Sequence, residues 1–121
     1  MTTYDLQDAE GRTFAFEVSN SFLRRRAIVR IVRTIPGARL TKEPRRWRLS
    51  NDEDFCEFEL DGAMFVASEP YGDNSRYWIG PRPPRWVAGV ERVQEAFARA
   101  EPLGPGLIAK ARALLGYRTA G

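Results

Sequence analysis

The strongest constraint on the fold is the dipeptide Asp61-Gly62, which lies between two runs of alternating residues. Such a dipeptide is typical of a two-residue β-hairpin, because a type I′ turn needs positive φ angles at both central positions. Side chains alternate along a strand, so one face of the hairpin is predicted to be apolar. Its predicted pairs are Leu60 with Ala63, Phe58 with Phe65, and Cys56 with Ala67.

The second face of this hairpin is predicted to be mixed. Its expected pairs are Glu59 with Met64, Glu57 with Val66, and Phe55 with Ser68. A slip of one residue would bury Glu57 and Glu59, so the hydrophobic pattern specifies the register. We therefore expect the apolar face to meet the core and the mixed face to be partly covered.

The flanking segments predict further strands and helices. Strands are expected at residues 4–6, 13–18 and 76–79, and residues 38–42 and 45–49 are expected as two short strands or as one strand broken by Pro44. In the strand at 45–49, Arg46 is expected opposite Glu57 and Trp47 beside Cys56. A helix is expected from N-caps at Ser19-Asn20-Ser21 to about Ile35, where Pro36-Gly37 ends it.

Two helices are expected towards the C-terminus. The first has an apolar stripe at helical spacing, formed by Trp86, Val90, Val93 and Phe97. The second covers residues 107–115, with Gly116 as its C-cap. The predicted fold is a single α+β domain over residues 1–121. Its antiparallel sheet has about five or six strands around the 54–69 hairpin, with one helix after strand two and two C-terminal helices.

Length and composition limit the class of protein. A chain of 121 residues with 43% hydrophobic content has the size and apolar content for one core. The sequence contains no run of 18 apolar residues, so no membrane span is predicted. The N-terminus lacks the basic and apolar parts of a signal peptide. One cysteine cannot form an internal disulfide, so we expect a cytoplasmic protein. Its many Arg and Ala residues are typical of a GC-rich bacterial genome.

Several chemistries are excluded by the absence of histidine. Ser-His and Cys-His nucleophilic pairs and the usual zinc sites need this residue. Cys56 is expected to be a buried, inert thiol. The acids Asp52, Glu53 and Asp54 match no calcium loop, so neither a metal site nor another cofactor is predicted.

Charge is distributed unevenly, although the net charge is only +3. Residues 21–48 contain ten Arg or Lys and one acid, and residues 49–74 contain eight acids and no base. In one interpretation the basic block binds nucleic acid through Arg26, Arg30 and Arg33, which share the predicted solvent face of the helix. In the other, basic and acidic strands are neighbours and neutralise one another.

The loop from Glu69 to Trp78 combines turn-forming residues with aromatic and charged side chains, a mixture that suits a binding surface. The candidate binding residues are Tyr71, Asp73, Arg76 and Trp78, and Trp78 is expected on the second sheet face. A structural alternative pairs Arg76 with Glu69. An enzyme would need Glu69 and Asp73 as carboxylates beside Arg76, and no such motif is recognisable, so no catalytic residue is predicted.

The favoured function is therefore a small, non-catalytic binding or protein-interaction module. Its partner is a protein, either another protein or a second copy of the chain, and no membrane is expected. The alternative is a nucleic-acid-associated protein that uses the basic block. A small enzyme ranks last.

Overall fold

The protein was analysed as a computed structural model, which describes residues 1–19, 23–44, 53–70 and 75–100. In chain order its elements are β1 (Thr3–Gln7), β2 (Thr13–Ser19), α1 (Arg25–Arg33), β3 (Arg39–Lys42), β4 (Asp54–Leu60), β5 (Ala63–Ser68), β6 (Arg76–Pro81) and α2 (Val90–Arg99).

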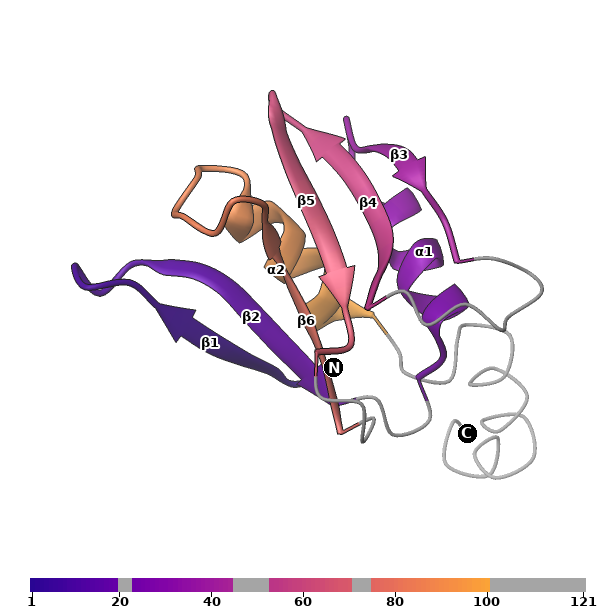
Figure 1. The fold of residues 1–121 in the computed structure, drawn as a ribbon, viewed down its shortest axis with the longest axis horizontal. Coiled ribbons are helices and arrows are strands. Elements are labelled where there is room, and N and C mark those ends of the chain that lie inside the picture. The colour runs from indigo at the N-terminus through magenta and orange to yellow at the C-terminus, as the bar shows by residue number, and fades with distance from the viewer. Residues whose placement is uncertain (20–22, 45–52, 71–74, 101–121) are drawn as a thin grey trace, which may run out of the picture.

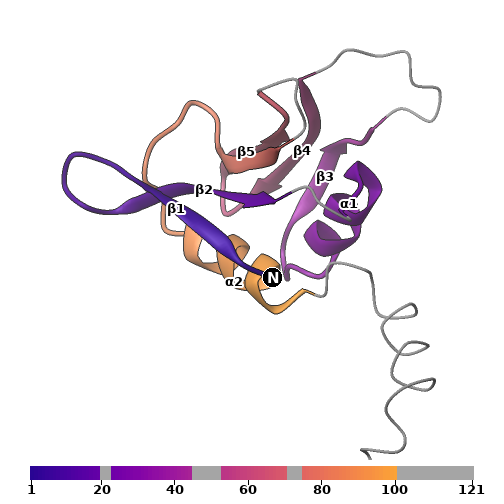
Figure 2. The same ribbon diagram turned by 90° about the horizontal axis from the view of Figure 1, so that it is seen from below.

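The strands form one antiparallel sheet in the order β1-β2-β6-β5-β4-β3. This confirms the predicted α+β class and the upper value of the predicted strand number. Helix α1 contacts β3 and β4, and α2 contacts β1 and β2. Both helices lie on the same side of the sheet (Figure 1, Figure 2).

The sheet therefore has two unlike faces. The covered face points towards the helices and includes Phe16, Val18, Phe58, Phe65, Tyr77 and Ile79. The open face points away from them and includes Tyr4, Glu17, Trp78, Ser68, Val66 and Glu57. Within the described residues no helix packs on the open face.

The central hairpin has the predicted register over most of its length. Asp61 and Gly62 have φ angles of 51° and 79°, as the turn requires. The pairs from Leu60–Ala63 to Cys56–Ala67 are confirmed on both faces. The predicted pairing of Phe55 with Ser68 is wrong, because Ser68 pairs with Asp54 across a β-bulge.

The bulge explains how an aromatic residue reaches the core at the start of β4. A bulge opposes two residues of one strand to one residue of its partner, so the alternation of side chains is locally broken. Phe55 is 1% exposed and packs edge-to-face on Tyr77, with ring centroids 5.3 Å apart. Phe55 and Cys56 are consecutive, and both belong to the core.

The core lies between the covered face and the two helices. Phe58 stacks on Phe65 across the hairpin, and Phe16 contacts Phe97 of α2 edge-to-face. Helix α1 contributes Ile28, Val29, Ile31 and Val32, and α2 contributes Val90, Val93 and Phe97. Apolar residues at helical spacing are thus buried against apolar residues at strand spacing, as the sequence pattern predicts.

Helix α1 is shorter than predicted. Ser19 pairs with Arg76 as the last residue of β2, so it does not cap the helix. The N-cap is Arg24, which makes no side-chain capping hydrogen bond. Ile35 is buried but lies beyond the end of the helix. Asn20 and Ser21 lie outside the described residues.

Helix α2 is the C-terminal helix within the described residues, and it starts later than the apolar stripe suggested. Trp86 precedes it and is 38% exposed, so its predicted place in the buried stripe is wrong. The prolines at 83 and 84 favour extended backbone before Trp86, and the indole contacts Arg12 instead. The predicted helix at 107–115 lies outside the described residues.

Strand β3 takes the place that was predicted for residues 45–49. Lys42 pairs with Glu57, so the predicted pairing of Arg46 with Glu57 is wrong. Leu40 lies opposite Phe58 and continues the apolar covered face. The strand ends near Pro44, because proline has no backbone N–H to donate to a neighbouring strand. Residues 45–52, which include Trp47, lie outside the described residues.

Candidate functional site

A single row of side chains crosses five strands on the open face. The antiparallel registers place Tyr4, Glu17, Trp78, Ser68 and Asp54 next to one another in this order, from β1 to β4. The prediction that Trp78 lies on the second face of the hairpin is therefore confirmed. Its neighbour Tyr77 points into the core and is 4% exposed.

The indole of Trp78 lies over a glycine. A Cβ atom built on Gly80 would lie 2.9 Å from Cη2 of Trp78 and 2.6 Å from Cβ of Ala15. Only glycine leaves this room, because real Cβ atoms essentially never make such short contacts. Gly80 therefore lets the ring pack closely against β6.

Arg82 follows β6 and reaches across the open face to β4. Its Nη1 lies 3.1 Å from Oδ2 of Asp54, and its Nη2 donates to Oδ1 at 3.2 Å. The guanidinium carbon is 5.8 Å from the centroid of the Trp78 ring. Because β5 separates β6 from β4, this side chain must cross β5 beside the indole.

Arg76 makes a similar arrangement at the other end of the row. Its Nη1 donates to Oε1 of Glu17 at 3.1 Å, and its guanidinium carbon lies 3.8 Å from the centroid of the Tyr4 ring. Tyr4 is 39% exposed, whereas Glu17 is buried. We call the two groups, Tyr4–Arg76–Glu17 and Trp78–Arg82–Asp54, the arginine triads.

The triads combine the exposed ring of Tyr4 and the partly exposed ring of Trp78 with oriented hydrogen-bonding groups. Each guanidinium has five N–H donors, and one carboxylate uses only some of them. The stacking rings and the ion pairs hold each guanidinium in place, which lowers the entropy lost when a partner binds. Each positive charge is matched by a carboxylate, so the triads are close to neutral. Such a surface suits a partner with both donors and acceptors.

Sequence reasoning located part of this site. Arg76 and Trp78 share the open face, as expected, while Tyr71 and Asp73 lie outside the described residues. Tyr4, Glu17, Asp54 and Arg82 were missed. Glu17 gave one usable signal, a charge between the apolar residues of β2. No local pattern connects the other three.

The predicted pairing of Arg76 with Glu69 is wrong. Arg76 pairs with Glu17 on the open face, and Glu69 follows the last residue of β5. Glu69 instead pairs with Arg25 of α1 at 2.6 Å, and Arg25 also stacks on Phe55. The arrangement required for the enzyme hypothesis, with Glu69 beside Arg76, is therefore not formed.

Two ionisable groups of the core are held in their neutral forms. The pKa of the Cys56 thiol is raised to about 12, mainly by burial and to a smaller extent by the negative charges of the nearby Glu43 and Glu57. Burial, followed by Glu69, raises the pKa of Tyr77 to about 12, and its hydroxyl donates to the carbonyl of Leu23 at 2.8 Å. Cys56 thus has the inert character that was expected.

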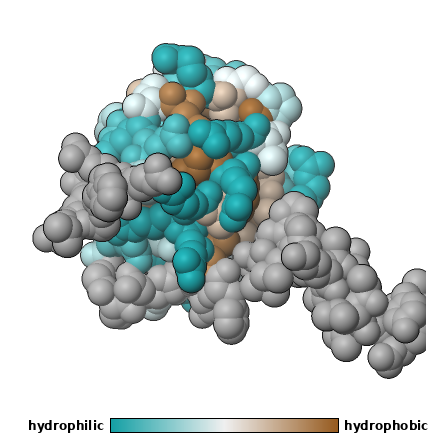
Figure 3. Space-filling model, turned by 90° about the vertical axis from the view of Figure 1, so that its right-hand side faces the viewer, coloured by the Kyte–Doolittle hydropathy of each residue, from teal (hydrophilic) through white to brown (hydrophobic). Residues whose placement is uncertain are grey.

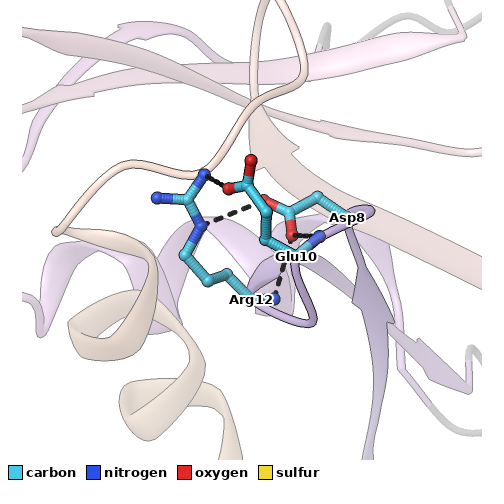
Figure 4. Close-up of polar contacts among 3 residues, drawn as sticks. All are labelled: Asp8, Glu10 and Arg12. Atoms are coloured by element: carbon cyan, nitrogen blue, oxygen red, sulfur yellow. Dashed lines mark hydrogen bonds and ion pairs between the residues drawn. The ribbon is translucent and has the colours of Figure 1, made fainter.

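A separate polar cluster shapes the turn between β1 and β2 (Figure 4). The Asp8 carboxylate accepts the backbone N–H groups of Glu10 and Arg12, both at 2.9 Å, and Arg12 pairs with both acids. These hydrogen bonds lower the pKa of Asp8, and the bond from the backbone N–H of Arg12 has the largest effect. The Arg12 guanidinium also lies 5.0 Å from the Trp86 ring centroid. This cluster stabilises the turn and joins it to the segment before α2.

The basic block is only partly neutralised by neighbouring acids. Arg25 pairs with Glu69, and Arg39 pairs with Glu59 across β3 and β4 at 2.6 Å. These contacts support the interpretation in which basic and acidic blocks pair. Arg26 and Arg30 are exposed on α1, as predicted, and make no ion pair with a described residue.

In the described ranges, no cluster of three Asp, Glu, Cys or His side chains is arranged to hold a metal ion. The same ranges contain no helix with the length and hydrophobicity needed to cross a membrane. Comparison of the chain with protein families, with curated proteins and with solved structures gave no match.

Proposed function

We propose that the protein is a small, non-catalytic interaction module whose open face binds a protein partner. The observation that carries this proposal is the row of five side chains with an arginine triad at each end. Tyrosine, tryptophan and arginine are the residues that most often dominate the binding energy of protein interfaces.

The two faces of the sheet differ in a way that supports this proposal. The covered face is filled by helices, whereas the open face ends in half-exposed side chains such as Tyr4 and Arg82. Since the triads pair each arginine with an acid, a polyanion would gain little from this face. A protein surface, which offers donors, acceptors and apolar area together, fits it better.

The first experiment measures whether the partner is a second copy of the chain. Light scattering over a range of protein concentrations gives the mass of the wild type and of the Arg82→Gln variant. A concentration-dependent dimer that Arg82→Gln weakens identifies a self-contact. A monomer at all concentrations directs the search to another protein, which is recovered by affinity purification from the source cells.

The second experiment measures the affinity of the recovered partner for folded variants. Arg76→Gln and Arg82→Gln should each weaken binding, by up to about 30-fold for an anchor that contributes 2 kcal/mol. Arg99→Gln is the matched control, because this arginine is exposed on α2, away from the open face. Unchanged affinity in both open-face variants, with circular dichroism showing intact folding, would refute the proposal.

A further inference from the structure

Helix α1 and its N-cap carry arginines whose charge is only partly balanced by acids among the described residues. Arg24, Arg26 and Arg30 are exposed, and none of them makes an ion pair with a residue in the described ranges. Arg33 continues the row and pairs with Glu43 at 3.1 Å, although both side chains are more than half exposed. We call Arg24, Arg26, Arg30 and Arg33 the α1 arginine row.

The other described arginines are mostly paired. Seven of them form ion pairs with acids: Arg12, Arg25, Arg39, Arg76, Arg82, Arg92 and Arg99. Arg25 shows the contrast most directly, because it lies between Arg24 and Arg26 in the sequence but turns inward to Glu69. Among the described residues, arginines without an acidic partner are thus concentrated on α1 and its N-cap, and Arg85, which donates to the carbonyl of Pro83, is the exception.

The position of these arginines is unfavourable for the helix itself. The N-terminal end of a helix carries partial positive charge, so Arg24 and Arg26 are repelled there. The first turn contains no acid and has no side-chain cap to offset this repulsion. Arg26 and Arg30 are also like charges one turn apart, which destabilises a helix. A purely structural role would favour the opposite charge at these positions.

We infer that the α1 arginine row binds the phosphate backbone of a nucleic acid. Guanidinium groups match phosphate oxygens in geometry, and the amide groups at an uncapped helix start add to the attraction. From Arg26 to Arg33 the row extends about 10 Å along the helix, which is the axial length of about three phosphates of one strand. Contacts of this kind are independent of base sequence.

The surroundings of the row favour nucleic acid over a lipid surface. A helix that lies in a membrane interface inserts an apolar face, but Ile28, Val29, Ile31 and Val32 are buried in the core. In the view from the α1 and β3 side, hydrophilic side chains lie across a narrower hydrophobic band (Figure 3). This side therefore presents mainly hydrophilic side chains, with a narrower hydrophobic band between them.

The inference is tested by fluorescence anisotropy with a short labelled DNA duplex and a short single-stranded RNA. For three phosphate contacts, the logarithm of the association constant should fall with the logarithm of salt concentration with a slope of about −2 to −3. The double variant Arg26→Gln/Arg30→Gln should weaken binding at least tenfold at low salt and make this slope shallower by about 1 to 2. Controls are Arg99→Gln, which removes one charge from α2, and Arg82→Gln, which alters the open face; neither should change the affinity by more than about twofold.

A second measurement separates this role from a structural one. Replacement of Arg26 by Glu places an acid in the first turn, four residues before Arg30. Arg26→Glu should therefore raise the melting temperature while it abolishes nucleic-acid binding. A stabilised variant that loses binding supports the inference, and a destabilised variant would contradict the electrostatic argument.

The following results would overturn the inference. One is the absence of binding to either nucleic acid at low salt. Another is an equal loss of affinity in Arg99→Gln and in the α1 variants, which would reflect net charge alone. Binding to anionic phospholipid vesicles or to an acidic peptide, with no binding to nucleic acid, would assign the row to that partner instead. Since Arg82→Gln tests the open face separately, failure here leaves the proposed protein interaction intact.

Discussion

The two faces of the sheet are built from different chemistry, although the same strands supply both. On the covered face, aromatic and aliphatic residues pack against two helices, and Phe16, Phe58 and Phe65 are fully buried. On the open face lie two arginines, their carboxylate partners and two aromatic rings, and of the two carboxylates that of Glu17 is buried. Alternation along a strand separates the two roles, because consecutive side chains point to opposite sides.

This comparison teaches where stability and recognition are expected to reside. Burial of apolar surface gives a large favourable free energy, whereas half-exposed ion pairs contribute little. Arg82, which lies beside Trp78 and pairs with Asp54 without adding much stability, is therefore better explained by binding. The comparison makes three predictions, given from the largest expected effect to the smallest.

Removing a large side chain from the covered face should have the largest effect. Phe58→Ala should lower the free energy of unfolding by about 3–5 kcal/mol, because the ring is fully buried and stacks on Phe65. Urea denaturation measures the loss. Tyr4→Ala on the open face is the control and should cost less than about 1 kcal/mol. A cost below about 1 kcal/mol for Phe58→Ala would mean that this face is not the core.

Arg25 of α1 and Arg82 of the open face should differ when each is replaced by alanine. Arg25→Ala should cost about 1–3 kcal/mol, because it leaves the carboxylate of Glu69, whose side chain is 10% exposed, without this partner. Arg82→Ala should cost less than about 1 kcal/mol, because its ion pair with Asp54 is half-exposed and screened by water. Equal costs in urea denaturation would show that the Trp78–Arg82–Asp54 triad stabilises the fold as strongly as a core contact.

Alkaline pH should lower the free energy of unfolding, because the thiol of Cys56 is buried on the covered face. Its pKa is raised from 9.0 to about 12 in the folded protein, so this contribution to stability is complete below pH 9. Above pH 9 the unfolded thiol ionises first, and the free energy of unfolding should fall by on the order of 1 kcal/mol by about pH 10. Urea denaturation from neutral to alkaline pH measures the decline, and Cys56→Ala should make it shallower. A decline of the same slope in Cys56→Ala would assign it to other groups, such as Tyr77.

Local patterns determined a large part of the architecture. The Asp61-Gly62 turn and the alternation of Phe58, Leu60 and Phe65 predicted the hairpin register, since turn geometry and burial act on residues close in the chain. Apolar spacing predicted the buried sides of α1 and α2 for the same reason. The pattern failed at Phe55, because a bulge is a local break in alternation that two-residue periodicity cannot detect.

Local sequence patterns predicted only part of the candidate site. Arg76 and Trp78 were selected because they lie in one distinctive loop and strand. Tyr4 and Glu17 belong to a different hairpin, and they meet Arg76 only because β2 pairs with β6. The order of strands in a sheet depends on long-range packing, which no short pattern records.

The sequence by itself therefore determined the class of fold, the central hairpin and the solvent-facing position of Arg26 and Arg30. Tertiary structure decided which charges meet. It paired Glu69 with Arg25, Glu17 with Arg76, and Arg82 with Asp54, and it left part of the α1 arginine row without an acid in the described ranges. The physical reason is that hydrophobic periodicity acts within single elements, whereas an ion pair depends on the distance between side chains that only the packed sheet and helices bring together.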